Sequence, residues 1–183
     1  MASDDELIGR SLAGDRAAFD DLVLRYQDSL FRHLLVLSGH PQLAEDLCQE
    51  ALIRFYRTLA RFHRGWPVAP LLFKIATNLW RDGRRRRAAI TTDSLDALPG
   101  DCAVEPEVVV LQRLQRGAIA DAIARLRWEY RAVISLRYDQ GLSYREIAQA
   151  LRVSVGTVAA WLHRAVDELR AALDADAGEE VAR

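Results

Sequence analysis

Apolar residues along this chain recur every three or four positions, which is the spacing that places side chains on one face of an α-helix. The stripes run from Leu7 to Leu12, from Phe19 to Leu34, from Leu43 to Leu59 and from Leu72 to Leu79, and a capping box of Ser3 and Glu6 precedes the first. Breaks around Gly14, Gly39 and Gly65 separate them. No run alternates apolar and polar residues for the length of a useful strand, so the sequence predicts an all-α fold.

Apolar spacing weakens after these helices and resumes near Val109. The intervening residues are small and acidic and include Pro99–Gly100, which is typical of a linker. We therefore expect two small helical domains, 1–88 and 113–173, joined by a flexible acidic linker over 89–112 and followed by an acidic tail over 174–183. Its least periodic part, residues 89–104, spans about 20–25 Å as a flexible coil and about 55 Å when stretched.

The end of the second domain has the layout of a helix-turn-helix. A capping box of Ser143 and Glu146 begins a helix over 144–151, and Ser154 is the expected N-cap of a second helix over 155–170. The residues expected to pack the two helices together are Ile147, Ala148, Leu151, Val153, Val158 and Leu162. An ordinary αα-hairpin has the same spacing and stays open as an alternative.

A helix-turn-helix presents the N-terminal half of its second helix to the major groove of DNA. The candidates for that face are Gly156, Thr157, Ala159, Ala160, His163 and Arg164. Ser154 and the free N–H groups beside it can hold a phosphate.

The net charge of −1 conceals an uneven distribution. Residues 15–90 carry 13 basic and 8 acidic residues, and residues 113–172 carry 10 basic and 6 acidic ones. Residues 91–112 hold five acidic residues and no basic one. All basic residues except Lys74 are arginine, which suits bidentate contacts with phosphates and bases but also fits a genomic codon bias.

Three polar residues, Asp46, Gln49 and Glu50, are spaced i, i+3 and i+4 opposite the apolar stripe of the third helix. They could receive arginine or lysine side chains of a partner. Periodicity alone favours a solvated helix face over a partner site.

Several function classes are disfavoured. No apolar run reaches the roughly 20 residues of a membrane span, and the acidic start is unlike a secretory signal. With only Cys48 and Cys102, no disulfide framework can form, so we expect a reducing cytoplasm. His33, His40, Cys48 and His63 lack metal-site spacing, and no nucleophile–base pair or phosphate loop occurs. We expect no enzyme, no metal and no cofactor.

Four segments together resemble the extracytoplasmic-function (ECF) sigma factors of the sigma-70 family, the promoter-specificity subunits of bacterial RNA polymerase. They are AGDRAAFDDLVLRYQDSLFRHL, AEDLCQEALIRFYRTLARF, FKIATNLWRDGRRRR and YRAVISLRYDQGLSYREIAQALRVSVGTV with LHRA after it. The resemblance covers nearly the whole chain.

The resemblance implies binding of core RNA polymerase and promoter DNA. Asp46, Gln49, Glu50 and Ile53 would dock on the coiled coil of the largest polymerase subunit. The residues implied at the −10 element, where an unpaired base is held, are Phe62, Trp66, Lys74, Asn78, Arg81, Arg84, Arg85, Arg86 and Arg87. Arg137 and Tyr144 would contact the phosphate backbone at the −35 element, and residues 156–164 would enter its groove. Trp66 could equally pack within its loop.

This chain departs from the family pattern in its reading helix. Ala159, Ala160 and Trp161 stand where the family usually has basic, small polar and arginine residues. Each good base contact contributes about 1–3 kcal/mol, so we expect an unusual or weak −35 preference. Leu71 also replaces an expected Trp, and Pro67 and Pro70 flank a short loop. We therefore expect a −10 pocket of different shape.

Two further readings stay open: a free-standing helix-turn-helix regulator, and a polymerase-binding adaptor with degenerate promoter reading. If the chain is a sigma factor, its two domains would bind two promoter boxes about 50–55 Å apart. The family implies an anti-sigma partner that masks both domains.

Overall fold

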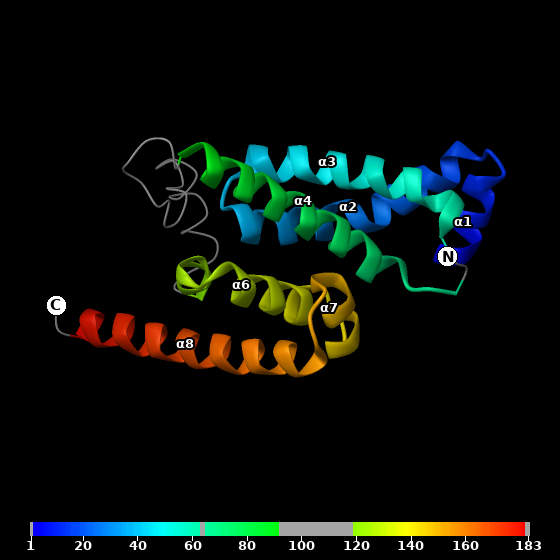
Figure 1. The fold of residues 1–183 in the computed structure, drawn as a ribbon. Helices are drawn as coiled ribbons and strands as arrows, with labels where there is room; N and C mark the ends of the chain where they lie inside the picture. Colours follow the sequence, from blue (N-terminus) through cyan, green and yellow to red (C-terminus); the bar gives the residue numbers. More distant parts are fainter. Residues whose placement is uncertain (1, 63–64, 92–118, 182–183) are drawn as a thin grey trace.

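The computed structural model describes residues 2–62, 65–91 and 119–181. Within these ranges all regular structure is helical and no strand occurs, as the apolar spacing predicts. Figure 1 shows helices α1 to α4 grouped together, with α6, α7 and α8 packed beside them.

The first two helices begin at side-chain caps. Helix α1 (Asp4–Leu12) starts at the predicted capping box, in which Ser3 and Glu6 each bond to the other's backbone N–H. Helix α2 (Arg16–Ser38) starts at Asp15 and ends at Gly39, whose φ of 72° is the left-handed conformation that favours glycine. The long helix α2 contacts α1, α3 and α4 and is the central helix of the first group.

Helix α3 (Pro41–Thr58) continues into a 3₁₀ turn, η1 (Leu59–Arg61). Its buried residues are Ala44, Cys48, Ala51 and Phe55, whereas the sequence pattern predicts Leu43 and Leu47 within the stripe. The two leucines are only half-buried, so the predicted face is rotated by one residue at this end. The small Ala and Cys side chains allow the backbone of α3 to lie close to its neighbours.

Helix α4 (Val68–Thr91) holds Pro70 in its first turn, where proline is tolerated. It buries Leu72, Phe73, Ala76 and Trp80 and continues past residue 88, the expected end of the first domain. The remainder of the predicted linker, residues 92–112, lies outside the described residues.

In the second group, residues 119–125 are helical and are followed by α6 (Trp128–Ile134) and a π-helical turn, η2 (Ser135–Asp139). The predicted helix-turn-helix follows as α7 (Tyr144–Leu151) and α8 (Val155–Val181). Its predicted capping box at Ser143 is present, and the expected packing residues are buried except for the half-buried Val153. Helix α8 extends well past residue 170, through a segment that is rich in alanine, a strong helix former.

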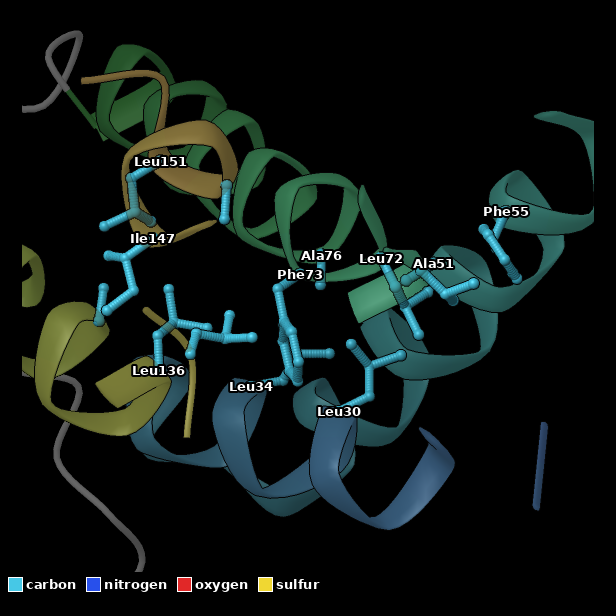
Figure 2. Packing of buried hydrophobic residues seen from close by; sticks show 14 of the residues in the cluster. Leu30, Leu34, Ala51, Phe55, Leu72, Phe73, Ala76, Leu136, Ile147 and Leu151 are labelled. Atoms are coloured by element: carbon cyan, nitrogen blue, oxygen red, sulfur yellow. The ribbon is translucent and has the colours of Figure 1, made fainter. Parts of the chain in front are cut away.

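The two groups share one apolar cluster. Figure 2 shows Leu34 and Phe73 from the first group beside Leu136 and Ile147 from the second, and all four are almost fully buried. Helix α7 packs on α4, while α6 and η2 pack on α2. Within the described residues, the helix-turn-helix is therefore continuous with the core of the first group.

Candidate nucleic-acid interface

One face of α4 collects polar and basic side chains. Lys74, Asn78, Arg81 and Arg85 are spaced by four, three and four residues, so they lie along a single side of the helix. The first three are half-buried and Arg85 is exposed. We call these four residues the α4 polar face.

Hydrogen bonds orient the α4 polar face. Arg81 Nη2 donates to Asn78 Oδ1 at 3.0 Å, which leaves the Asn78 amide nitrogen as a donor. Arg85 Nη2 pairs with Asp82 at 2.8 Å. Because Arg85 is largely exposed, a phosphate could displace this weak surface pair.

The structure divides the four consecutive arginines that the sequence groups together. Arg84 lies over two indole rings, 5.3 Å from the centroid of Trp80 and 5.6 Å from that of Trp128. Arg86 and Arg87 are exposed but project from other sides of α4 than Arg85. Only Arg85 of the four shares a face with Asn78.

Trp66 lies at the surface beside the start of α1, with 66% of its area exposed. It borders an open depression of about 420 Å³, also lined by Asp5, Arg25, Tyr26 and Pro67 among others. The loop is held by the N–H of Gly65, which donates to the Asp5 carboxylate at 3.0 Å. The alternative of inward loop packing does not describe Trp66, and the contribution of α1 and α2 to this depression was not anticipated from the sequence.

Phe62, the other aromatic residue implied at the −10 element, is placed differently. It packs edge-on against Phe55, with ring centroids 6.4 Å apart, and is half-buried at the first group's core. Phe62 is not among the residues lining the depression. The two aromatic residues that the sequence pairs therefore occupy separate environments.

The start of α8 is capped as predicted. The N–H of Thr157 donates to Ser154 Oγ at 3.0 Å, and the two hydroxyls are 2.8 Å apart. A side chain at Gly156 would meet only the Ser154 hydroxyl, at 3.7 Å. The backbone at Gly156 can therefore approach a ligand closely, but this conformation does not demand glycine.

Beyond that first turn, the outer face of α8 carries few polar side chains. Ala159, Ala160, His163 and Arg164 are exposed, and His163 lies 3.5 Å from Asp167. Trp161 is half-buried and packs against the apolar clusters, as expected for a packing residue. Thr157, His163 and Arg164 are the polar side chains this face offers.

Arg137 and Tyr144 lie together at the start of the helix-turn-helix. The Arg137 guanidinium is 5.5 Å from the Tyr144 ring centroid and donates to the carbonyl of Leu142 at 2.9 Å. Tyr144 is 40% exposed. The sequence predicts both as phosphate contacts, and the structure places them side by side.

The polar residues of α3 lie opposite its buried side. Asp46 and Gln49 are exposed, and Ile53 is 47% exposed, a large apolar residue beside two polar ones. Glu50 is half-buried and forms an ion pair with Arg54 at 2.6 Å. We call Asp46, Gln49, Glu50 and Ile53 the α3 patch.

Other chemistry is sparse in the described part of the chain. No group of three or more His, Cys, Asp or Glu side chains there could hold a metal ion. No described helix is both long and apolar enough to cross a membrane. Cys48 is buried, and its burial raises the pKa of the thiol to about 11.

One residue with a distinctive environment was missed by sequence reasoning. His33 is completely buried between the two groups, where its ring nitrogens contact Ser135 Oγ at 3.1 Å and Thr77 Oγ1 at 3.0 Å. Burial lowers the pKa of its imidazole to about 3. Its position on the buried side of the α2 stripe was the one available signal.

Comparison with known proteins links these surfaces to a family. Residues 22–90 match the family described as Sigma-70 region 2, and residues 116–169 match Sigma-70, region 4. The chain is 32% identical to the RNA polymerase sigma-H factor of Pseudomonas aeruginosa, over 93% of each chain. It is 34% identical to the ECF RNA polymerase sigma factor SigW of Bacillus subtilis, covering 86% of this chain and 89% of SigW.

A solved structure agrees with these matches. CnrH, in complex with the cytosolic domain of CnrY, superposes with a TM-score of 0.72 at 28% identity, covering 94% of this chain and 98% of CnrH. The α4 polar face lies within the region 2 match and the helix-turn-helix within the region 4 match. The chain belongs to the ECF sigma factors of the sigma-70 family.

Proposed function

We propose that this sigma factor directs core RNA polymerase to its promoters through three surfaces: the α3 patch, the α4 polar face with Trp66, and the first turns of α8. The observation that carries the proposal is the α4 polar face, where an amide and three cations share one side of a helix. Sigma factors are initiation factors rather than enzymes, and the site of action would be the cytoplasm, where transcription takes place.

The α3 patch is the proposed docking site for the coiled coil of the largest polymerase subunit. Two exposed polar residues, Asp46 and Gln49, would meet basic side chains, while Ile53 would bury an apolar contact. Glu50 must exchange its Arg54 partner for one on the polymerase. Since 41% of the Glu50 side chain and 51% of the Arg54 side chain remain accessible to solvent, the exchange costs little.

The −10 element is proposed to lie along the α4 polar face. Asn78 would bond to a base edge, and Lys74, Arg81 and Arg85 would hold phosphates. Trp66 would stack the unpaired base at the edge of the depression, because aromatic rings hold single-stranded bases by stacking. Phe62 would support the loop from the core rather than contact the base.

The −35 element is proposed to meet the start of α8. Thr157, His163 and Arg164 are the polar groups available for base edges, and Ala159 and Ala160 can contact thymine methyl groups. Arg137 and Tyr144 would position the domain on the backbone. A contact surface with so few polar groups supports a weak or unusual −35 preference.

Run-off transcription with core polymerase and a promoter library tests the proposal. The wild-type chain should initiate on a defined promoter class, and no initiation on any template would refute it. Asp46→Arg with Glu50→Arg should abolish polymerase binding, and Asp46→Arg alone should weaken it. Glu45→Arg, the same single charge reversal on another side of α3, should not.

A second comparison tests the α4 polar face. Arg85→Ala should weaken promoter opening, while the neighbouring Arg86→Ala, which removes the same charge from another side of α4, should weaken it less. Equal losses would indicate a diffuse electrostatic role instead of a defined face. An anti-sigma partner is also proposed from the family resemblance, and CnrH was itself solved with a protein partner, the cytosolic domain of CnrY.

A further inference from the structure

The contact between the two groups of helices is a packed interface with its own polar centre. Leu34 of α2 and Phe73 of α4 lie against Leu136 of η2 and Ile147 of α7 within one buried cluster. Two domains that move independently would each bury their own apolar side chains. Here the apolar side chains of one domain complete the core of the other.

His33 lies at the centre of this interface. Its Nδ1 contacts the Ser135 hydroxyl of the second domain at 3.1 Å, and its Nε2 contacts the Thr77 hydroxyl of the first domain at 3.0 Å. The edge of the imidazole also packs on Phe73, with ring centroids 5.3 Å apart. The imidazole therefore bridges α2, α4 and η2 with no exposed surface.

Polar contacts surround this buried centre. Arg32 pairs with Asp139 at 3.3 Å, the Gln140 amide donates to the carbonyl of Ser29 at 3.3 Å, and Arg131 Nη2 donates to the carbonyl of Leu37 at 3.3 Å. Each contact joins α2 to the second domain. The interface thus has an apolar core and a hydrogen-bonded rim, as specific protein interfaces do.

The interface also occupies one of the arginines predicted to hold promoter DNA. Trp80 of α4 and Trp128 of α6 lie with ring centroids 5.4 Å apart, and the Arg84 guanidinium lies over both. A cation held over aromatic faces is stabilised by the electrostatic attraction of the rings. Arg84 would have to leave Trp128 if the second domain moved away.

The closed arrangement conflicts with simultaneous reading of two promoter boxes about 50–55 Å apart. Helix α7 packs directly on α4, so the two DNA-reading elements belong to one packed unit. We propose that the buried His33 bridge makes this closed form of the free protein sensitive to pH: the bridge restricts closure to the neutral imidazole, so protonation of His33 favours the open form in which both boxes can be engaged.

The bridge makes closure dependent on pH. Burial lowers the pKa of His33 to about 3 in the closed form, while a solvated histidine titrates near 6.5. A group with a lowered pKa stabilises the closed form above pH 6.5 and progressively less below it. Between pH 7.5 and pH 5.5 the closed-to-open ratio should therefore fall about tenfold.

The pH dependence of closure must be separated from the effects of other charged groups on the packed elements. They are Arg32 on α2, Lys74 on α4, and Arg137 and Asp139 on η2, all at least partly exposed. The lowered pKa of His33 arises from burial rather than from any of them. Asp139 carries the one carboxylate among them, so Asp139→Asn tests whether its protonation contributes.

The experiment measures energy transfer in the full-length chain between dyes attached through non-natural residues at Ala13 and Gln149, both exposed and outside the proposed contact surfaces. Transfer should fall as pH decreases from 7.5 to 5.5. His33→Gln, which retains hydrogen-bonding groups without titrating, should abolish that pH dependence. His40→Gln, at a partly exposed histidine, should leave the pH dependence intact, and so should Asp139→Asn.

Ser135→Ala guards against a simple folding defect, because it removes the cross-domain partner while leaving the first domain unchanged. It should lower transfer at pH 7.5 with helical content retained. Core polymerase plus promoter DNA should also lower transfer at that pH. The proposal is overturned if transfer does not respond to pH, if His33→Gln titrates like wild type, or if transfer stays high on the promoter. Because the pH test contains no DNA, its failure would leave the proposed promoter function intact.

Discussion

The turn of the helix-turn-helix contains a backbone conformation that is unfavourable for its residue. Arg152 ends α7 with φ 57° and ψ 47°, the one left-handed non-glycine residue in the described part of the chain. Its N–H donates to the carbonyl of Ala148. Gly39 ends α2 with the same type of cap, with φ 72° and a 2.8 Å bond to Leu35. The two caps therefore share one left-handed conformation, which is unfavourable for arginine and favourable for glycine.

Arg152→Gly should therefore stabilise the protein. The left-handed conformation costs an L-residue about 1–2 kcal/mol. Glycine offsets part of this gain, because it loses about 0.5–1 kcal/mol more than alanine in chain entropy on folding. The expected net gain is about 0.5–1 kcal/mol, or about 1–4 °C in melting temperature for a chain of this size.

Urea unfolding followed by far-ultraviolet circular dichroism measures the effect. Arg152→Ala keeps the left-handed residue and removes only the exposed side chain, so it should change stability by less than about 0.5 kcal/mol. Gly39→Ala should destabilise by about 1 kcal/mol through the same conformational cost. The reasoning is refuted if Arg152→Gly is no more stable than Arg152→Ala, since that would place the energy in side-chain contacts.

Three other substitutions test separate features. Ser143→Ala removes the side-chain cap of α7 and should cost about 1 kcal/mol in urea unfolding. Ala159→Arg adds a guanidinium to the exposed face of α8 and should strengthen holoenzyme binding to promoter DNA by about 1–3 kcal/mol, measured by fluorescence anisotropy. Unchanged affinity would exclude this position from the DNA surface. Because burial raises the pKa of Cys48 to about 11, its thiol in a Cys102→Ser background should resist alkylation at pH 8 until urea unfolds the chain.

Local features of the fold follow directly from the sequence. Both predicted capping boxes are present, at Ser3 and Ser143, and Gly39 ends α2 as expected. These features depend on residues within one turn of each other, so nearby sequence contains the information needed to predict them. The same holds for the helix-turn-helix, whose packing residues are set by the spacing within residues 147–162.

The composition of the candidate site could be predicted only in part. The sequence groups Arg84, Arg85, Arg86 and Arg87 as equivalent phosphate contacts. The 100° rotation between successive helical residues sends them in different directions, and the approach of Trp128 from α6 draws Arg84 away from the surface of Asn78. Likewise Phe62 and Trp66 look alike in sequence, but only Trp66 borders the depression.

The sequence by itself determined an all-α chain, its helix caps, its helix-turn-helix and its family, because each depends on local spacing or on motifs in order. Tertiary structure alone decided how the two domains meet. That contact joins residues more than 100 positions apart, such as His33 and Ser135, and no local pattern records which distant hydroxyl a buried imidazole will find. The charge blocks of the sequence suggested two separate DNA-facing units, whereas burial of apolar side chains from both joins them into one core.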